Sequence, residues 1–279
     1  LSERGFATLG KITAVIFSIF CIGGSFGGGN AFQSNQAAVQ LKSLFNIDGG
    51  ASGIIIGVIM AVLVGIVIIG GIKRIASITE KIVPAMAGIY VVASLVIIFA
   101  NFSHIGDAFS LIFSGAFSPI AAVGGVIGVI IVGFQRAAFS NEAGAGSAAI
   151  AHSAVRTKYP ASEGVVALLE PFIDTVVICT MTALVIIIFN FGGDASGASI
   201  FQYGGDGAGA VLIDGVSYEG AGITQKAFAT YIPYSNVFLT VAVVLFAVST
   251  MISWSYYGLQ SWKYLFGRGK RADMVYKIL

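Results

Sequence analysis

Charged residues are scarce in this chain. They make up 10% of its 279 residues, whereas an ordinary soluble domain has about 25%. Hydrophobic residues make up 57%, and the mean hydropathy is +0.92. A soluble fold of this length could not cover its surface with so few charges. The composition therefore excludes an ordinary soluble protein and predicts a protein embedded in a lipid bilayer.

Cysteine and histidine are also rare, with two residues of each. Cys21 and Cys179 lie inside apolar runs, where cysteine usually serves as a small hydrophobic residue, and no zinc or disulfide spacing occurs. Neither His104 nor His152 has a cysteine or carboxylate partner at metal-ligand spacing. The phosphate-binding pattern GxxxxGK[ST] is missing as well. We therefore expect no organic cofactor and no ATP-driven transport, and a net charge of +2 is too small to indicate a nucleic-acid partner.

Long apolar runs are what the sequence has in abundance. A helix needs about 20 apolar residues to cross a bilayer, and only helices of this length satisfy their backbone in lipid. The runs are 9–29, 51–72, 82–102, 115–138, 163–190 and 234–257. We expect the first run to continue as a helix with a polar face to about residue 44. The fold class predicted is an all-α integral membrane protein, with residues 1–279 as a single transmembrane domain.

Basic residues indicate the orientation of these spans. Of the 15 lysines and arginines, all except Lys42 and Lys226 fall on one side of the predicted bilayer. Because cytoplasmic loops are rich in these residues, both ends of the chain should be cytoplasmic in a multi-pass protein of the plasma membrane. The glycine-rich loop 192–232 then faces outward, and we expect it to be irregular or to contain a short hairpin. The amphipathic segments 72–82 and 107–117 should lie at the inner and outer surfaces.

Two polar clusters at membrane depth are candidates for a substrate site. In the first, several glycines precede Asn30, and Gln33, Gln36 and Gln40 share one helix face. This face could bind a small polar solute, or it could be the wetted outer end of a helix. In the second, segment 115–128, Pro119 and two following glycines could break the helix. Such a break frees backbone groups that transporters use to bind carboxylates and cations, although an ordinary proline kink is the alternative.

Two further clusters carry carboxylates and hydroxyls. Glu170 and Asp174 are one helical turn apart and could form a proton or cation relay, or could simply reach the inner interface. Ser249 and Thr250 lie late in an apolar helix. Their hydroxyls could bond back to their own helix, or could ligate a hard monovalent cation such as sodium.

The segment 139–154 is too polar to span the membrane and too poor in large side chains to form a core. We expect it to be a cytoplasmic connector, with Asn141 and Glu142 at its helix start. Close packing through its glycines and alanines would allow it to act as part of an inner gate, and a plain packed linker is the alternative.

Five stretches of the chain resemble one known family. They are similar, in the same order, to segments of the alanine-or-glycine:cation symporter family. The stretches are GGGNAFQSN (27–35), AFSPIAAVGG (116–125), FSNEAGAGSAAIAHSA (139–154), PFIDTVVICTMTALVI (171–186) and STMISWSYYG (249–258). One departure is QRAAF at 135–139, where the family has RG before FSNEAG, which puts the tightness of that turn in doubt.

The resemblance implies a fold and a function. The fold would be of the leucine-transporter type, with two inverted repeats. Family members have more spans than this chain, which begins with Leu1, so we expect a fragment lacking the N-terminal spans and the last spans. The 115–138 helix would line the substrate site, and the 234–257 helix would supply oxygen ligands to sodium. The implied function is sodium-coupled symport of small neutral amino acids such as alanine and glycine, with sodium co-transported.

These arguments select three groups of residues. The substrate would contact Asn30, Gln33, Phe117, Ser118 and Gly125. Sodium would be held by Ala247, Ser249 and Thr250, of which Ala247 and Thr250 are carried over from the resemblance. Glu142, Glu170 and Asp174 are candidates for a gate or relay.

Two other functions stay open. The same glycines could line a channel or uniporter without sodium coupling, and Glu170 with Asp174 could serve a membrane-embedded enzyme. We expect a transporter rather than an enzyme, with a small neutral amino acid and the lipid bilayer as its partners.

Overall fold

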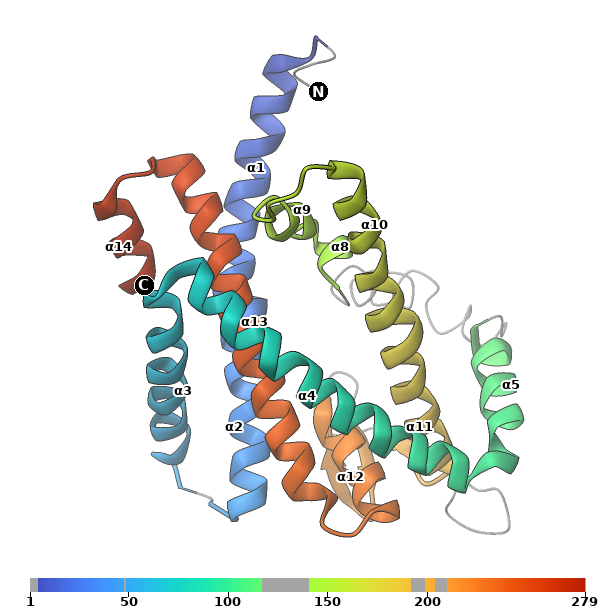
Figure 1. Cartoon of the computed structure of the whole chain (residues 1–279). Helices are drawn as coiled ribbons and strands as arrows, with labels where there is room; N and C mark the ends of the chain where they lie inside the picture. The colour runs from blue at the N-terminus through green and yellow to red at the C-terminus, as the bar shows by residue number, and fades with distance from the viewer. Residues whose placement is uncertain (1–4, 48, 117–140, 192–198, 204–209, 279) are drawn as a thin grey trace. The chain divides into compact units, whose positions relative to one another are not determined.

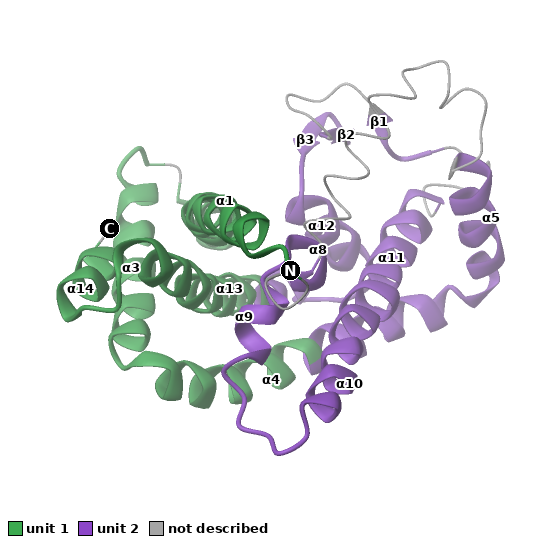
Figure 2. Ribbon diagram, turned by 90° about the horizontal axis from the view of Figure 1, so that it is seen from above, with its two compact units in different colours: residues 1–87, 240–279 green, residues 88–239 purple. Residues whose placement is uncertain are grey.

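The computed structural model describes residues 5–47, 49–116, 141–191, 199–203 and 210–278 (Figure 1). Most of them are helical. Among them, five helices are long and apolar enough to cross a membrane: Ala7–Phe45, Ser52–Ile69, Gly71–Ala100, Pro160–Phe191 and Ser235–Phe266. Each overlaps one of the predicted spans, and the remaining predicted span, 115–138, lies almost wholly outside the described residues. The described chain divides into two compact units, residues 1–87 with 240–279 and residues 88–239 (Figure 2).

The first unit opens with one long helix that contains a wider turn. Helix α1 (Ala7–Phe26) passes into the π-helical turn η2 (Gly27–Ala31) and then into α2 (Phe32–Phe45). The helix ends at Asn46, which adopts the left-handed conformation (φ 52°) that asparagine tolerates better than most residues. The helix therefore runs as far as the polar face of the sequence had indicated.

The next two helices follow with very short connections. Helix α3 (Ser52–Ile69) is separated from α4 (Gly71–Ala100) by Gly70, and Gly71 takes a φ of 70° that favours glycine. The amphipathic segment 72–82, expected as a separate surface segment, is continuous with the span that follows it. Pro84 lies inside α4 and removes one backbone donor without ending the helix.

The core of the first unit joins α2, α3 and α13 (Ser235–Phe266). Ala37, Met60 and Ile252 are almost fully buried in it. Lipid chains are as apolar as these side chains, so tight packing rather than escape from water stabilises this core. Small residues matter most where backbones approach closely, and the buried Gly29 is such a place: a Cβ atom there would collide with Cβ and Cγ of Trp254 on α13.

The second unit contains the connector and most of the remaining helices. These are η3 (Phe102–His104), α5 (Ile105–Ala116), α8 (Glu142–Ala145), α9 (Ala148–His152), α10 (Pro160–Pro171), the π-helical segment η4 (Phe172–Cys179), α11 (Thr180–Phe191) and α12 (Ala221–Tyr231). The predicted cap of α8 is confirmed, because Oδ1 of Asn141 accepts a hydrogen bond from the Gly144 amide at 3.1 Å.

A small antiparallel sheet lies in the loop 192–232, and it contains the short hairpin that the sequence had suggested. Its strands are β1 (Gln202–Tyr203), β2 (Val211–Ile213) and β3 (Val216–Tyr218), in that order. Ile213 pairs with Val216 across Asp214 and Gly215, which both have positive φ as a tight hairpin turn requires. The helix α12 in the same segment was not predicted, because the many glycines of the segment mask the helix-forming run that contains Ala227 and Phe228.

The segment that contains β2 and α12 is part of the core of the second unit. Phe228 and Ile213 are almost fully buried, beside Ile97 of α4 and Ile188 of α11. The rings of Phe228 and Tyr90 are 5.6 Å apart. The segment that connects α11 to α13 (Ser235–Phe266) therefore contributes to the core in which α4 and α11 pack.

Gly29→Ala should lower the stability of the first unit. The new methyl group would meet the Trp254 side chain, and overpacking typically costs about 1–3 kcal/mol. Gly27→Ala is the matched control, since Gly27 lies in the same π-helical turn and a Cβ atom there would have no neighbouring atom within 4 Å. Thermal unfolding in detergent of the full-length protein measures the difference. Equal melting temperatures for the two variants would contradict the close approach of η2 and α13.

Candidate functional site

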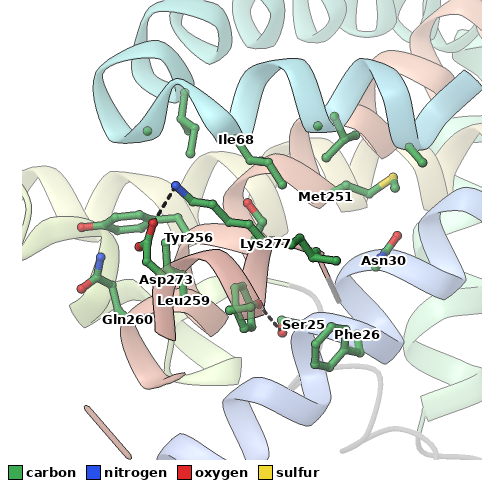
Figure 3. A pocket seen from close by; sticks show the side chains of 18 of the residues that line it. Ser25, Phe26, Asn30, Ile68, Met251, Tyr256, Leu259, Gln260, Asp273 and Lys277 are labelled. Atoms are coloured by element: carbon green, nitrogen blue, oxygen red, sulfur yellow. Dashed lines mark hydrogen bonds and ion pairs between the residues drawn. The ribbon is translucent and has the colours of Figure 1, made fainter. Parts of the chain in front are cut away.

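A cavity of about 500 Å³ lies within the first unit (Figure 3). This volume suits a small organic molecule. Its walls come from α1, η2, α2, α3, α4, α13 and α14 (Lys270–Ile278). Apolar side chains such as Ile68 and Met251 form part of the wall, and Asn30, Ser255 and Gln260 supply polar groups. The cavity therefore combines an apolar lining with a few separated polar groups.

The π-helical turn η2 presents Asn30 to this cavity. In a π-helical turn the hydrogen bonds run over five residues, which widens the helix, and such turns are frequent at functional sites. The sequence GGGNA allows the distortion because three of its residues have no side chain to obstruct it. Asn30 lies in the cavity wall, as Figure 3 shows. Of the predicted substrate residues, Asn30 is thus the one that a described cavity contains.

Gln33 and Gln40 have different surroundings. Nε2 of Gln33 donates to the carbonyl oxygen of Gly28 at 3.4 Å, so this side chain braces the π-helical turn. Gln40 is almost fully buried, and its Oε1 has no hydrogen-bond partner within the described part of the chain. The amide face predicted from the spacing therefore extends from the π-helical turn into the protein interior.

One side of the cavity is closed by α14, a helix that the sequence analysis missed. Asp273 contacts Nζ of Lys263 on α13 at 2.6 Å and Nζ of Lys277 at 3.0 Å. The hydrogen bond with Lys263, more than that with Lys277, lowers the pKa of the Asp273 carboxyl. The i,i+4 pair Asp273–Lys277 was a signal that could have revealed this helix.

A second contact joins α14 to α1. The hydroxyl groups of Tyr276 and Ser25 are 2.9 Å apart, two residues before the π-helical turn begins. A Cβ atom on Gly258 of α13 would meet both hydroxyl groups, so glycine makes room for this junction. Burial raises the pKa of Tyr276, which keeps its hydroxyl group protonated. Helices α1, α13 and α14 therefore meet at the Ser25–Tyr276 contact, which connects the cavity wall to the π-helical turn.

The predicted sodium ligands share one turn of α13. Ala247 and Ser249 are buried and Thr250 is half-buried. The hydroxyl group of Ser249 donates to the carbonyl oxygen of Phe246 at 3.0 Å, as serine often does within helices. This bond uses the proton and leaves lone pairs on the Ser249 oxygen. The oxygen can therefore still accept a cation.

The predicted gate or relay residues belong to the second unit. Glu142 is the first residue of α8, Glu170 lies in α10, and Asp174 lies in η4, the second π-helical segment of the chain. The predicted residues Phe117, Ser118 and Gly125 fall outside the residues that the structure describes.

His152 has carboxylate partners, contrary to the expectation from its spacing. Its Nδ1 lies 2.6 Å from Oε1 of Glu163, and its Nε2 lies 3.5 Å from Oε2 of Glu170. The chain reverses between α9 and α10, which brings residues distant in sequence together. Glu163 and Glu170 are seven residues apart and so share a helix face, which was the available signal.

Comparison with known proteins identifies the family. The sequence model of the family described as the sodium:alanine symporter family matches residues 3–279. The chain belongs to the sodium:alanine symporter family. The resemblance carried by the five ordered stretches is therefore confirmed. As a member of a transporter family with five candidate membrane helices among its described residues, it is a multi-pass membrane protein.

Several curated relatives are similar to this chain over most of its length. The sodium/alanine symporter AgcS of Methanococcus maripaludis is 39% identical over 260 residues, which is 93% of this chain and 52% of the relative. The amino-acid carrier protein AlsT of Bacillus subtilis is 33% identical over 82% of this chain and 44% of the relative. The probable sodium/glutamine symporter GlnT of Bacillus subtilis is 30% identical over 89% and 47%. The chain spans about half the length of the curated relatives it matches.

Tyr276→Phe should loosen α14 in this symporter family member. The change removes only the hydroxyl group that bonds to Ser25, and one such bond contributes about 0.5–1.5 kcal/mol. Cleavage within residues 267–278 by a protease, measured on the full-length protein, should become several-fold faster. Tyr264→Phe is the control, because Tyr264 is exposed. Equal cleavage of the two variants would show that the Ser25 contact does not hold α14.

Proposed function

We propose that this chain is part of a carrier that transports small neutral amino acids, alanine and glycine above all, together with sodium. The observation that carries the proposal is Asn30, which a π-helical turn presents to a cavity of suitable size within a sodium:alanine symporter family member. The names of the relatives, which include a sodium/alanine symporter and an amino-acid carrier protein, support the same function.

The chemistry of the substrate explains the choice of Asn30. A neutral amino acid carries a carboxylate, which needs hydrogen-bond donors, and an ammonium group, which needs acceptors. The amide of Asn30 supplies two donors and one acceptor oxygen. Gln33, whose Nε2 donates to the carbonyl oxygen of Gly28, would hold the turn in place and offer its Oε1 to the substrate. Phe117, Ser118 and Gly125 complete the site in this proposal, as the broken helix of a leucine-transporter-type fold would do.

Sodium would bind the turn that contains Ala247, Ser249 and Thr250. Hydroxyl and carbonyl oxygens suit a hard cation, and a set without carboxylates suits a single positive charge better than a double one. Coupling follows if bound sodium stabilises the state of the carrier that binds the amino acid, because each ligand then raises the affinity for the other.

The orientation and extent of the carrier are also part of the proposal. Both ends of the chain would be cytoplasmic in the plasma membrane, because the lysines and arginines lie almost entirely on one side. Residues 1–279 would form a portion of one transmembrane domain. Glu170 and Asp174 remain candidates for a relay, and Glu142 for a gate at the connector.

Asn30→Ala should weaken alanine uptake by the full-length carrier in membrane vesicles. Losing hydrogen bonds to a charged substrate costs about 1.5–3 kcal/mol, so the alanine concentration for half-maximal uptake should rise roughly ten- to hundredfold. Asn35→Ala is the control, because Asn35 is an amide on the same helix that lies outside the wall of the large cavity. Wild-type uptake that is equally fast with and without a sodium gradient would instead indicate a uniporter or channel.

Thr250→Ala should reduce the affinity for sodium. Loss of one oxygen ligand costs about 1–3 kcal/mol, which corresponds to one to two decades in the sodium concentration for half-maximal uptake. Thr230→Ala is the control, because the hydroxyl group of the exposed Thr230 bonds within α12, to the carbonyl oxygen of Lys226. Sodium dependence that is unchanged in Thr250→Ala, at normal expression, would remove Thr250 from the site.

A further inference from the structure

The imidazole ring of His152 lies between two carboxylates of α10. Nδ1 is 2.6 Å from Oε1 of Glu163, whereas Nε2 is buried, makes no hydrogen bond within the described part of the chain and lies 3.5 Å from Oε2 of Glu170. The three side chains are between 18% and 33% exposed, so water reaches part of the cluster, although Nε2 of His152 itself is buried. A neutral imidazole has one N–H group, whereas a protonated one has two. Only the protonated ring can donate toward both carboxylates.

The same connector is attached to this helix at a second place. Nδ2 of Asn141 donates to Oγ1 of Thr175 in η4 at 2.6 Å. Asn141 and His152 lie near the two ends of the described connector, residues 141–155. The connector therefore contacts the helix 160–191 at Thr175 and again at the pair Glu163 and Glu170. Thr175 adjoins Asp174, so the second attachment reaches the segment of the predicted relay.

The charges around the ring favour its protonated form. The described groups that act electrostatically on His152 are Glu163 and Glu170, both negative and both from α10, and its own helix α9 has no other charged residue. The hydrogen bond with Glu163 raises the pKa of His152 above its ordinary 6.5, with a smaller contribution from Glu170. A proton is the ligand that this geometry fits, because Nδ1 of His152 is within hydrogen-bond distance of the Glu163 carboxylate.

We propose that His152 is a proton-binding site, and that the bound proton fastens the connector 141–155 to the helix 160–191. Because the pKa is raised, the charged contact is complete below pH 6.5 and is lost as the pH rises through the raised value. Asn141 holds the other end of the connector regardless of pH. Proton binding by His152 does not depend on the proposed function. Its effect on transport does, and in transport His152 acts as a positioning residue for the connector.

Hydrogen exchange in the full-length protein tests the proton-binding site directly. Amide protection of residues 142–154, corrected for the intrinsic effect of pH, should fall on the order of tenfold between a pH well below 6.5 and one well above it, because a charge-assisted bond is lost. In His152→Gln the protection should be the same at both values. His104→Gln is the control and should behave as the wild type, since His104 lies on η3 beside Asp107, at 3.8 Å.

Glu163→Gln is a second variant that keeps an acceptor for His152 but removes the charge. Its protection at acidic pH should fall toward that of His152→Gln. Wild-type protection that is independent of pH, or an unchanged pH dependence in His152→Gln, would overturn the proposal.

Alanine uptake by the same proteins separates the two proposals. If His152 positions the connector, the maximal uptake rate of the wild type and of His104→Gln should vary with pH, and the rate of His152→Gln should vary less. If no protein takes up alanine but the exchange results hold, the proposed function fails and the proton-binding site stands. If sodium-dependent uptake is present while protection does not depend on pH, the proton-binding site alone fails.

Discussion

Backbone hydrogen bonding inside lipid is the constraint on which this structure depends. No water is present in the hydrocarbon region to bind a free N–H or C=O group, so each long apolar segment must be a helix. A segment that departs from the α-helix must then pair its backbone N–H and C=O groups in another hydrogen-bonding pattern. The segments Gly27–Ala31 and Phe172–Cys179 do so as π-helical turns. Both coincide with polar clusters, which contain Asn30 and Asp174, so the chain accommodates these polar groups without leaving the backbone unsatisfied.

Close helix packing is the second consequence of the lipid environment. Since apolar side chains gain little by leaving lipid for protein, contact area must come from shape. Gly29 against Trp254 and Gly258 against the Ser25–Tyr276 pair are positions where the lack of a side chain permits the contact. Ser25 and Tyr276 lie in the wall of the cavity beside Asn30, so the shape of this wall depends on Gly258, which is not part of it.

Much of the helical arrangement could be predicted from the sequence, and much of the local structure could not. The lengths of the apolar runs predicted the five long helices. The polar face after the first run predicted that its helix continues to about residue 44, and it ends at Phe45. The helix α14 was missed because it is short and polar, and α12 because glycines surround it. The contacts of His152 with Glu163 and Glu170 depend on a chain reversal, which periodicity does not encode. Asn30 was found from its glycine neighbours, whereas the part played by α14 in the cavity required the tertiary structure.

The burial of Phe228 and Ile213 has a consequence for biogenesis. Their partners Tyr90 and Ile97 lie far earlier in the sequence, and a chain is made from its N-terminus onward. The second half of α4 and the helix α11 would thus be synthesised before the hairpin and α12 that complete their core. The second unit cannot reach its final packing by membrane insertion of its long helices alone. Its last folding step must await the segment 211–228, and contacts this distant in sequence make that step slow.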